Sequence, residues 1–228
     1  MPATAIFDLD RTITREPTWT RFLLFVNGKR PGFWLSAPAL LGQAIAYKAG
    51  FADRDSVKKR GLRTLSHLGE TDFNAAANAF IAREVAEGLR PGAVAAIQWH
   101  AQRGDRLVIA TAAIAPIAEA LGRALGFHDI IATDLDWSKG APPAPRLAGA
   151  NCYGAEKRRR LEAAGLCDSD FLYSDHISDL YILLRAKHGI AVNPSAQLRT
   201  AAPARGLTIA DFDSTDIQFL KEKANGAL

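Results

Sequence analysis

The feature that most constrains the fold of this 228-residue sequence is a regular alternation of helix-like and strand-like segments after Gly88. Short aliphatic runs typical of buried parallel strands are separated by longer segments with helical periodicity. The predicted strands are 106–111, 129–133, 171–174, 190–192 and 208–210, and the predicted helices are 91–103, 114–125, 154–164, 178–187 and 195–202. This order favours an α/β fold, a Rossmann-like doubly wound parallel sheet with helices on both faces.

Before this alternation lies a region in which only helices are expected. Residues 3–7 form a further predicted strand, and the next predicted helices are 18–27, 34–48, 54–66 and 72–87. Asp72 is expected to cap its helix, whereas Gly28, Gly50 and Gly88 are expected to end theirs. Because some seventy residues are too many for a loop, we predict a helical cap domain at 16–88, inserted after the first strand into a catalytic core made of 1–15 and 89–228.

The composition is that of an ordinary globular chain, with 48% hydrophobic residues and a formal charge of +4. This mild excess of basic residues suits an anionic substrate, but no aromatic residues are interleaved with the Lys157–Arg160 run, so we expect no nucleic-acid partner. Cys152 and Cys167 lack metal-type spacing, which favours a reducing compartment. The N-terminus shows no signal-peptide pattern, and a cytoplasmic location is therefore predicted.

An apolar stretch at 33–47 lies between Lys29-Arg30 and Lys48. It is shorter than the roughly 20 residues that a spanning helix needs, and Ser36, Pro38 and Gln43 interrupt it, so stable membrane insertion is not expected. A buried helix, a partner-facing helix and interfacial membrane contact remain open for it. This stretch is also a candidate dimer face, so the choice between a monomer and a homodimer stays open.

Two carboxylates lie at the end of the first predicted strand. Asp8 and Asp10 follow the apolar run directly, and alternation along an extended chain puts both on the same side. Two acids held so close repel each other unless a cation or a shared proton offsets their charge. This pair is therefore a candidate Mg²⁺ site with an oxygen available for nucleophilic attack.

Further polar residues follow the ends of later strands. Thr111 ends one strand, and its hydroxyl with the amides of Ala112 and Ala113 could hold a phosphoryl oxygen at a helix start. Lys157 begins a helix and could neutralise phosphoryl charge. Asp175 ends another strand, with Asp179 four residues later, and both are candidate metal residues beside Asp8 and Asp10. We expect all of them at the carboxyl edge of the sheet.

These segments together resemble the four motifs of the haloacid dehalogenase superfamily. The motifs are Asp8-Leu9-Asp10-Arg11-Thr12, Ile109-Ala110-Thr111, Glu156-Lys157 and Tyr173-Ser174-Asp175-His176-Ile177-Ser178-Asp179-Leu180. More narrowly the chain resembles subfamily IB, the phosphoserine-phosphatase-like group. The resemblance implies that Asp8 attacks phosphorus, forming an aspartyl phosphate, and that Asp10 protonates the leaving alcohol and then activates water.

The same resemblance implies roles for the surrounding residues. Mg²⁺ would be held by Asp8, the Asp10 backbone carbonyl and Asp175, while Thr12 would orient Asp10. The candidate substrate-binding residues are Thr12, Glu16, Thr111, Ala112, Lys157 and Ser178. Glu16 would hold a substrate amine, and Arg54 or Arg63 a carboxylate.

The chain departs from the family pattern at a few positions. Arg11 stands where glycine is usual, although a positive φ is costly for arginine. Ala112 and Ala113 replace small polar residues, and Ser174 and His176 flank Asp175. None of these changes removes a predicted catalytic group.

The preferred hypothesis is a Mg²⁺-dependent phosphomonoesterase acting on a small phosphorylated metabolite similar to phosphoserine. One alternative, raised by the apolar stretch at 33–47, is a phosphatidylglycerophosphate-type lipid phosphate phosphatase. Another is a low-turnover phosphate-binding regulatory protein, although a regulator needs neither a second acid such as Asp10 nor a large cap.

Overall fold

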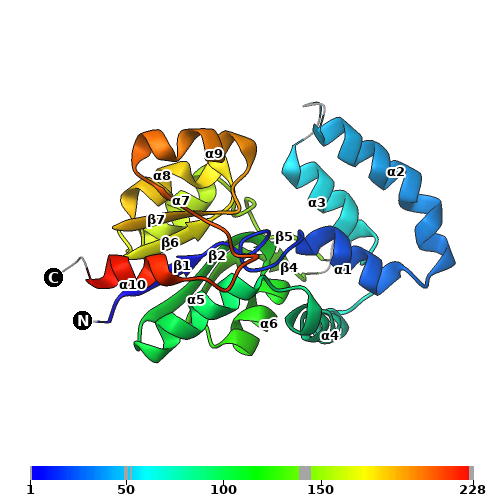
Figure 1. Ribbon diagram of the computed structural model, residues 1–228. Helices are drawn as coiled ribbons and strands as arrows, with labels where there is room; N and C mark the ends of the chain where they lie inside the picture. The colour runs from blue at the N-terminus through cyan, green and yellow to red at the C-terminus, as the bar shows by residue number, and fades with distance from the viewer. Residues whose placement is uncertain (1, 49–50, 52, 139–144, 226–228) are drawn as a thin grey trace.

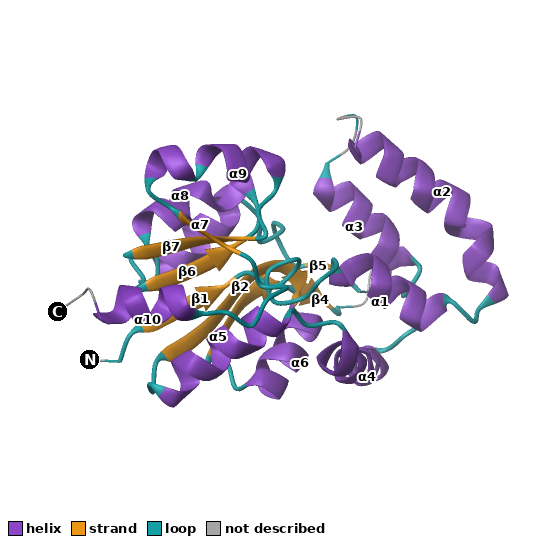
Figure 2. Cartoon of the chain, viewed as in Figure 1, coloured by secondary structure: helices purple, strands orange, loops and turns teal. Residues whose placement is uncertain are grey.

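A six-stranded parallel sheet forms the centre of the molecule (Figure 1; strands orange in Figure 2). The structure, a computed structural model, describes residues 2–48, 51, 53–138 and 145–225. The strand order is β3-β2-β1-β6-β7-β8, with β1 Thr4–Phe7, β2 Arg106–Ile114, β3 Asp129–Thr133, β6 Phe171–Ser174, β7 His188–Val192 and β8 Thr208–Ala210. The predicted doubly wound α/β fold is confirmed.

The register of the three central strands brings their carboxyl ends to one level. Phe7 of β1 pairs with Ile109 of β2 on one side and with Tyr173 of β6 on the other. The next residue along, Asp8, donates its backbone N–H to the Tyr173 carbonyl over 2.9 Å. The residues that follow β1 and β6, together with Thr111 in β2, therefore emerge side by side.

Two hydrophobic clusters cover the two faces of this sheet. Neighbouring residues of β1 point to opposite faces, and accordingly Phe7 belongs to one cluster and Ile6 to the other. The helices of the core are α5 Pro91–Gln102, α6 Ala115–Leu125, α7 Ala155–Ala163, α8 Leu180–Arg185, α9 Ala196–Ala201 and α10 Gln218–Asn225. Figure 1 shows α5, α6 and α10 on one side of the sheet and α7, α8 and α9 on the other.

Four helices lie between β1 and α5, beyond the carboxyl edge of the sheet (Figure 1). They are α1 Thr18–Asn27, α2 Pro31–Lys48, α3 Arg54–Arg63 and α4 Glu70–Glu87. The rings of Phe73 and Phe80 pack on Phe22 with centroids 5.3 and 5.5 Å away. Phe22 and Phe73 belong to the same hydrophobic cluster as Phe7 of the sheet, so the boundary between a core and a separate cap at 16–88 stays a prediction.

The two connections to these helices run side by side. Thr14 and Leu89 form an isolated antiparallel bridge. The Arg15 N–H donates to the Gly88 carbonyl and the Arg90 N–H to the Ile13 carbonyl, both over 2.9 Å. Backbone hydrogen bonds therefore fix the entry and exit of the helical segment against each other.

Several element boundaries differ from the sequence prediction. The N-cap of α4 is Gly69, not Asp72, which lies inside the helix and has no capping role. The sequence predicts no strand between residues 133 and 171, but β4 Leu135–Asp136 and β5 Arg146–Leu147 form a short antiparallel pair there. The predicted helix 178–187 is divided into a 3₁₀ turn, Ile177–Asp179, and the short helix α8. Gly50 lies outside the described residues.

The strand β2 is longer than predicted, running through Ile114, so α6 begins only at Ala115. Helix α10 was not predicted at all. In the described part of the chain, no helix has the length and hydropathy that crossing a bilayer would require.

Gly189 is needed where β7 passes the end of α8. A Cβ atom there would lie 2.2 Å from the Leu183 carbonyl oxygen, which is backbone and cannot move aside cheaply. We therefore expect Gly189→Ala to lower the free energy of unfolding by about 1–3 kcal/mol in urea denaturation. A Cβ at Gly32, in α2, would meet nothing within 4 Å, so Gly32→Ala is the matched control and should not destabilise. Equal stability of the two variants would contradict this packing.

Candidate active site

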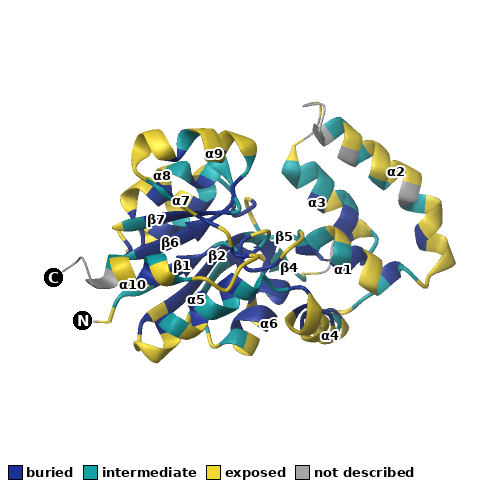
Figure 3. Ribbon diagram, in the orientation of Figure 1, coloured by how far each residue is buried: buried dark blue, intermediate teal, exposed yellow. Residues whose placement is uncertain are grey.

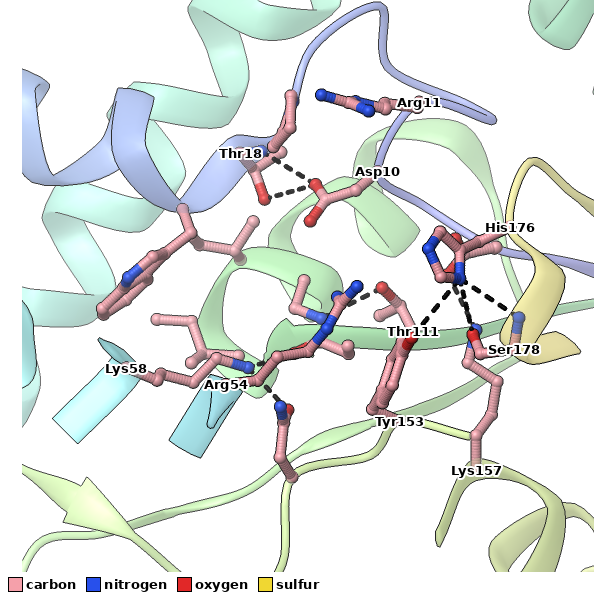
Figure 4. A pocket seen from close by; sticks show the side chains of 18 of the residues that line it. Asp10, Arg11, Thr18, Arg54, Lys58, Thr111, Tyr153, Lys157, His176 and Ser178 are labelled. Carbon is pink, nitrogen blue, oxygen red and sulfur yellow. Dashed lines mark hydrogen bonds and ion pairs between the residues drawn. The ribbon is translucent and has the colours of Figure 1, made fainter. Parts of the chain in front are cut away.

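A cavity of about 440 Å³ lies between the carboxyl edge of the sheet and the inserted helices (Figure 4). Asp8, Thr111 and Asp175 reach it from β1, β2 and β6, the three central strands. Its opposite wall comes from α1 and α3, which contribute Trp19 and Lys58 among others. The sheet edge thus supplies carboxylates, and the inserted helices close over them.

Lys157, at the start of α7, is buried among these carboxylates. Its Nζ lies 3.0 Å from Asp8 Oδ1 and 2.7 Å from Asp179 Oδ2, and the side chain is 3% exposed. Burial opposes its charge, but the two carboxylates outweigh that effect and raise the pKa of Lys157 above its usual value. Ser174 Oγ also donates to Asp179 Oδ2 over 2.7 Å. Asp179 therefore holds the ammonium group in place beside Asp8.

One ammonium group does not neutralise the carboxylates around it. Burial raises the pKa of Asp8 to about 6, with Lys157 lowering it and Asp179 and Asp10 raising it further. Burial also raises the pKa of Asp175 to about 7, and the charges of Asp8 and Asp179 add to this effect. The carboxylates gathered around Lys157 therefore outnumber the one ammonium group among them.

This excess of charge fits a divalent cation with oxygen ligands. Mg²⁺ usually takes one or two carboxylates and keeps several waters, and Asp8 and Asp175 are the acids whose charge is least compensated. Among the described residues no group of three acid, histidine or cysteine side chains is close enough to hold an ion alone. The donor set thus fits an ion bound by two carboxylates and water.

Asp10 is oriented by a residue that the sequence analysis did not identify. Thr18, at the start of α1, donates both its backbone N–H and its hydroxyl to Asp10 Oδ1, each over 2.8 Å (Figure 4). Burial raises the pKa of Asp10, and these two hydrogen bonds partly offset the rise. The first inserted helix therefore positions the second acid of the pair.

Lys58 of α3 connects the inserted helices to the sheet edge. Its Nζ donates to the Ala112 carbonyl and, over 2.6 Å, to Asn151 Oδ1. The side chain is 8% exposed, and burial lowers the pKa of Lys58 to about 8. It lines the cavity and brings a second cation to it (Figure 4).

A polar rim adjoins these groups. The guanidinium of Arg54 lies 3.8 Å from the centre of the Tyr153 ring. His176 Nδ1 accepts a hydrogen bond from the Ser178 N–H over 3.1 Å, and burial lowers the pKa of His176. All four side chains line the cavity (Figure 4).

A sequence profile of the family described as haloacid dehalogenase-like hydrolase matches residues 5–184, which contain the whole of this constellation. The chain belongs to that family.

Individual relatives resemble the hydrolase along most of its length. The histidinol-phosphatase of Neisseria meningitidis is 24% identical over 225 residues, which cover 91% of this chain and 98% of that protein. The phosphoserine phosphatase SerB1 of Mycobacterium tuberculosis is 26% identical over 230 residues, covering 93% of this chain and 71% of that protein. A solved structure of a Bordetella pertussis protein of unknown function superposes with a TM-score of 0.80 at 25% identity, covering 93% and 99% of the two chains.

The structure of the hydrolase brings most of the predicted site residues together. The residues from the sequence analysis that line the cavity are Asp8, Asp10, Thr111, Ala112, Lys157, Asp175, Ser178 and Asp179. Arg54 also lines it, whereas Arg63 is exposed and does not. Lys58 and Thr18 could not be singled out, because nothing in the sequence distinguishes them from other helix residues.

Thr12 and Glu16 do not lie where the resemblance placed them. Thr12 is fully buried outside the cavity, and its hydroxyl makes no hydrogen bond, so Thr18 and not Thr12 orients Asp10. Glu16 is exposed and does not line the cavity. The prediction for Ala112 and Ala113 also needs correction, since both lie within β2 and not at a helix start. The Ala113 N–H donates to Thr111 Oγ1 over 3.0 Å.

Arg11 adopts the strained conformation that glycine usually takes in this motif, with φ of 63°. Its carbonyl accepts a hydrogen bond from Arg90 Nε over 2.9 Å. Arg90 itself forms an ion pair with Asp213, which follows β8, the last strand of the sheet. The backbone at the motif is therefore held by the segment that leads out of the inserted helices.

The two buried threonines allow a matched test of the Asp10 contact. Thr18→Val removes the hydroxyl that donates to a carboxylate, so we expect kcat for ester hydrolysis to fall about tenfold. Thr12→Val removes a buried hydroxyl that has no partner, so kcat should stay within about twofold and stability should not fall. Steady-state kinetics and thermal denaturation of both variants test this assignment. A larger fall in kcat in Thr12→Val than in Thr18→Val would contradict it.

The raised pKa values of Asp8 and Asp175 predict how stability depends on pH. The folded state holds their protons up to about pH 6 and 7, whereas the unfolded chain releases them near 4. Metal-free protein should therefore lose stability as pH rises from about 4 to 7. In EDTA we expect a higher melting temperature at pH 5.5 than at pH 7.5, and Mg²⁺ should stabilise mainly at the higher pH.

Asp175→Asn is the control for this pH dependence, because it removes one of the two titrating carboxyls. The difference in melting temperature between the two pH values should shrink in this variant. An unchanged difference would show that other groups control the pH dependence. About 1 kcal/mol moves the melting temperature of a protein of this size by about 2–4 °C, which calorimetry resolves.

Proposed function

We propose that this hydrolase is a Mg²⁺-dependent phosphomonoesterase that works through an aspartyl phosphate. The observation that carries the proposal is the contact of Asp8 with Lys157 at the carboxyl edge of the sheet, beside the separately oriented Asp10. Phosphoryl transfer mainly requires positioning and neutralisation of charge, and this arrangement supplies both. The names of the relatives, histidinol-phosphatase and phosphoserine phosphatase, support the same reaction class.

The proposed reaction has two steps. A carboxylate oxygen of Asp8 attacks phosphorus, and the bond to the ester oxygen breaks while Asp10 gives that oxygen a proton. Asp10 then takes a proton from the water that attacks the aspartyl phosphate, which releases inorganic phosphate and restores Asp8. Lys157 and the Thr111 hydroxyl, both of which line the cavity, would hold the phosphoryl oxygens. Mg²⁺, held by Asp8, Asp175 and the Asp10 carbonyl, would neutralise phosphoryl charge.

The position of Asp10 favours turnover over a regulatory role. A regulator that is phosphorylated on an aspartate needs no second acid, whereas here two hydrogen bonds from Thr18 hold Asp10 inside the cavity. The raised pKa of Asp10 suits a group that donates and accepts a proton. We therefore prefer the enzymatic function to the low-turnover regulator.

The cavity favours a small anionic metabolite as the substrate. Its volume of about 440 Å³ suits a small ester, and Lys58, Arg54 and Arg11 line it beyond the phosphate-binding groups. Glu16 lies outside, so recognition of a substrate amine by that residue is not part of the proposal. The described side chains of the apolar helix α2 do not line the cavity, which removes the main reason for a lipid phosphate as the substrate. We place this reaction in the cytoplasm.

Replacing the proposed nucleophile is the direct test. Asp8→Asn should lower the hydrolysis of an aryl phosphate by at least about a thousandfold, because an amide cannot form the phosphoenzyme. Asp168→Asn is the control, since the exposed Asp168 pairs with the exposed Arg185 and does not line the cavity, so turnover should stay unchanged. Circular dichroism establishes that both variants fold. Wild-type turnover in Asp8→Asn would exclude the mechanism.

Removal of the metal tests the cofactor separately. Chelation should abolish turnover and added Mg²⁺ should restore it, whereas full activity in chelator would contradict a metal-dependent site. A panel of phosphorylated metabolites, including phosphoserine and histidinol phosphate, together with one lipid phosphate, would then rank the substrates by kcat/KM.

A further inference from the structure

Helix α2 presents an apolar face that no described part of the chain covers. Trp34, Leu41 and Ile45 are separated by seven and four residues, a spacing that puts them on one face of the helix. Their exposed fractions are 55%, 62% and 58%, and the adjacent Leu35 is 87% exposed. We refer to these four residues as the α2 patch. Exposed apolar surface of this extent, gathered on one helix, indicates an interaction site.

The α2 patch is separate from the active site. Figure 1 shows α2 at the outer edge of the inserted helices, with α3 between it and the sheet, and Figure 3 shows that most of α2 is exposed. Helix α3 contributes Arg54, Val57 and Lys58 to the cavity, whereas none of the side chains of α2 that the structure describes lines it. Contact at the patch would therefore leave the catalytic groups untouched.

The sequence around the patch carries only positive charge. From residue 17 to residue 52 there is no aspartate or glutamate, while Arg21, Lys29, Arg30 and Lys48 are basic. Lys29 and Arg30 are exposed directly before the start of α2. An apolar helix face next to exposed basic residues is complementary to a surface that combines negative charge with accessible hydrocarbon.

We propose that the α2 patch docks the protein on an anionic lipid bilayer, with α2 lying in the plane of the interface. Trp34 and its three aliphatic neighbours would enter the boundary between headgroups and acyl chains, and Lys29 and Arg30 would contact anionic headgroups. A second copy of the chain fits less well, because pairing two acid-free helices would place basic groups opposite basic groups. The proposal concerns location only and does not depend on the proposed phosphatase activity.

Flotation with lipid vesicles tests this docking on the full chain. We expect binding to vesicles rich in phosphatidylglycerol, weaker binding to phosphatidylcholine vesicles, and release from the phosphatidylglycerol vesicles as salt rises. The double variant Leu41→Glu/Ile45→Glu should lower partition onto phosphatidylglycerol vesicles by at least about tenfold, since Leu41 and Ile45 lie on one face of α2 and the change puts two carboxylates into that face. A blue shift of tryptophan fluorescence on binding should disappear in Trp34→Phe.

Leu184→Glu is the matched control, because Leu184 is a leucine with an exposed fraction of 47% on α8, which covers the sheet and is not one of the inserted helices. It should bind vesicles like the wild type. All variants should keep the circular dichroism spectrum of the wild type, which shows that they are folded. Absence of vesicle binding by the wild type would overturn the proposal, and so would a concentration-dependent dimer that the double variant abolishes without any loss of vesicle binding.

Discussion

The contact of the Lys157 ammonium group with Asp8 and Asp179 is the interaction on which the active site depends. It joins the start of α7 to the end of β1 and to the turn after β6, so segments far apart in the sequence meet at one buried charge. A buried ion pair is costly unless its geometry is good and its remaining atoms are bonded. Ser174, which donates to Asp179, meets part of that need. The pair thus holds a cation beside the carboxylate that we propose as the nucleophile.

The inserted helices take part in this site as well as covering it. Thr18 at the start of α1 fixes Asp10, and Lys58 of α3 reaches the Ala112 carbonyl and Asn151. Both contacts cross from the insertion to the sheet edge. Movement of the insertion would therefore change the orientation of Asp10 and the charge in the cavity together, which links access to the site with its chemistry.

The fold could be predicted because its signals are local. The aliphatic run at 107–110 and the apolar residues before Asp8 have the composition of buried parallel strands, and strands in this order assemble in few ways. Asp8 and Asp175 could also be placed, since each directly follows the end of a strand. Thr18 and Lys58 could not, because their roles depend on how the insertion packs on the sheet. Glu16 lies outside the cavity although it closely follows the first motif, because its position in the sequence does not determine the direction of its side chain.

A structure determined with Mg²⁺ and beryllofluoride would test the central claim most directly, because this anion mimics a phosphoryl group on a carboxylate. The account predicts beryllium bonded to a carboxylate oxygen of Asp8, with a fluorine within hydrogen-bonding distance of Lys157 Nζ and the Thr111 hydroxyl. Beryllium on Asp10 or Asp175, or an adduct that Lys157 does not contact, would contradict it.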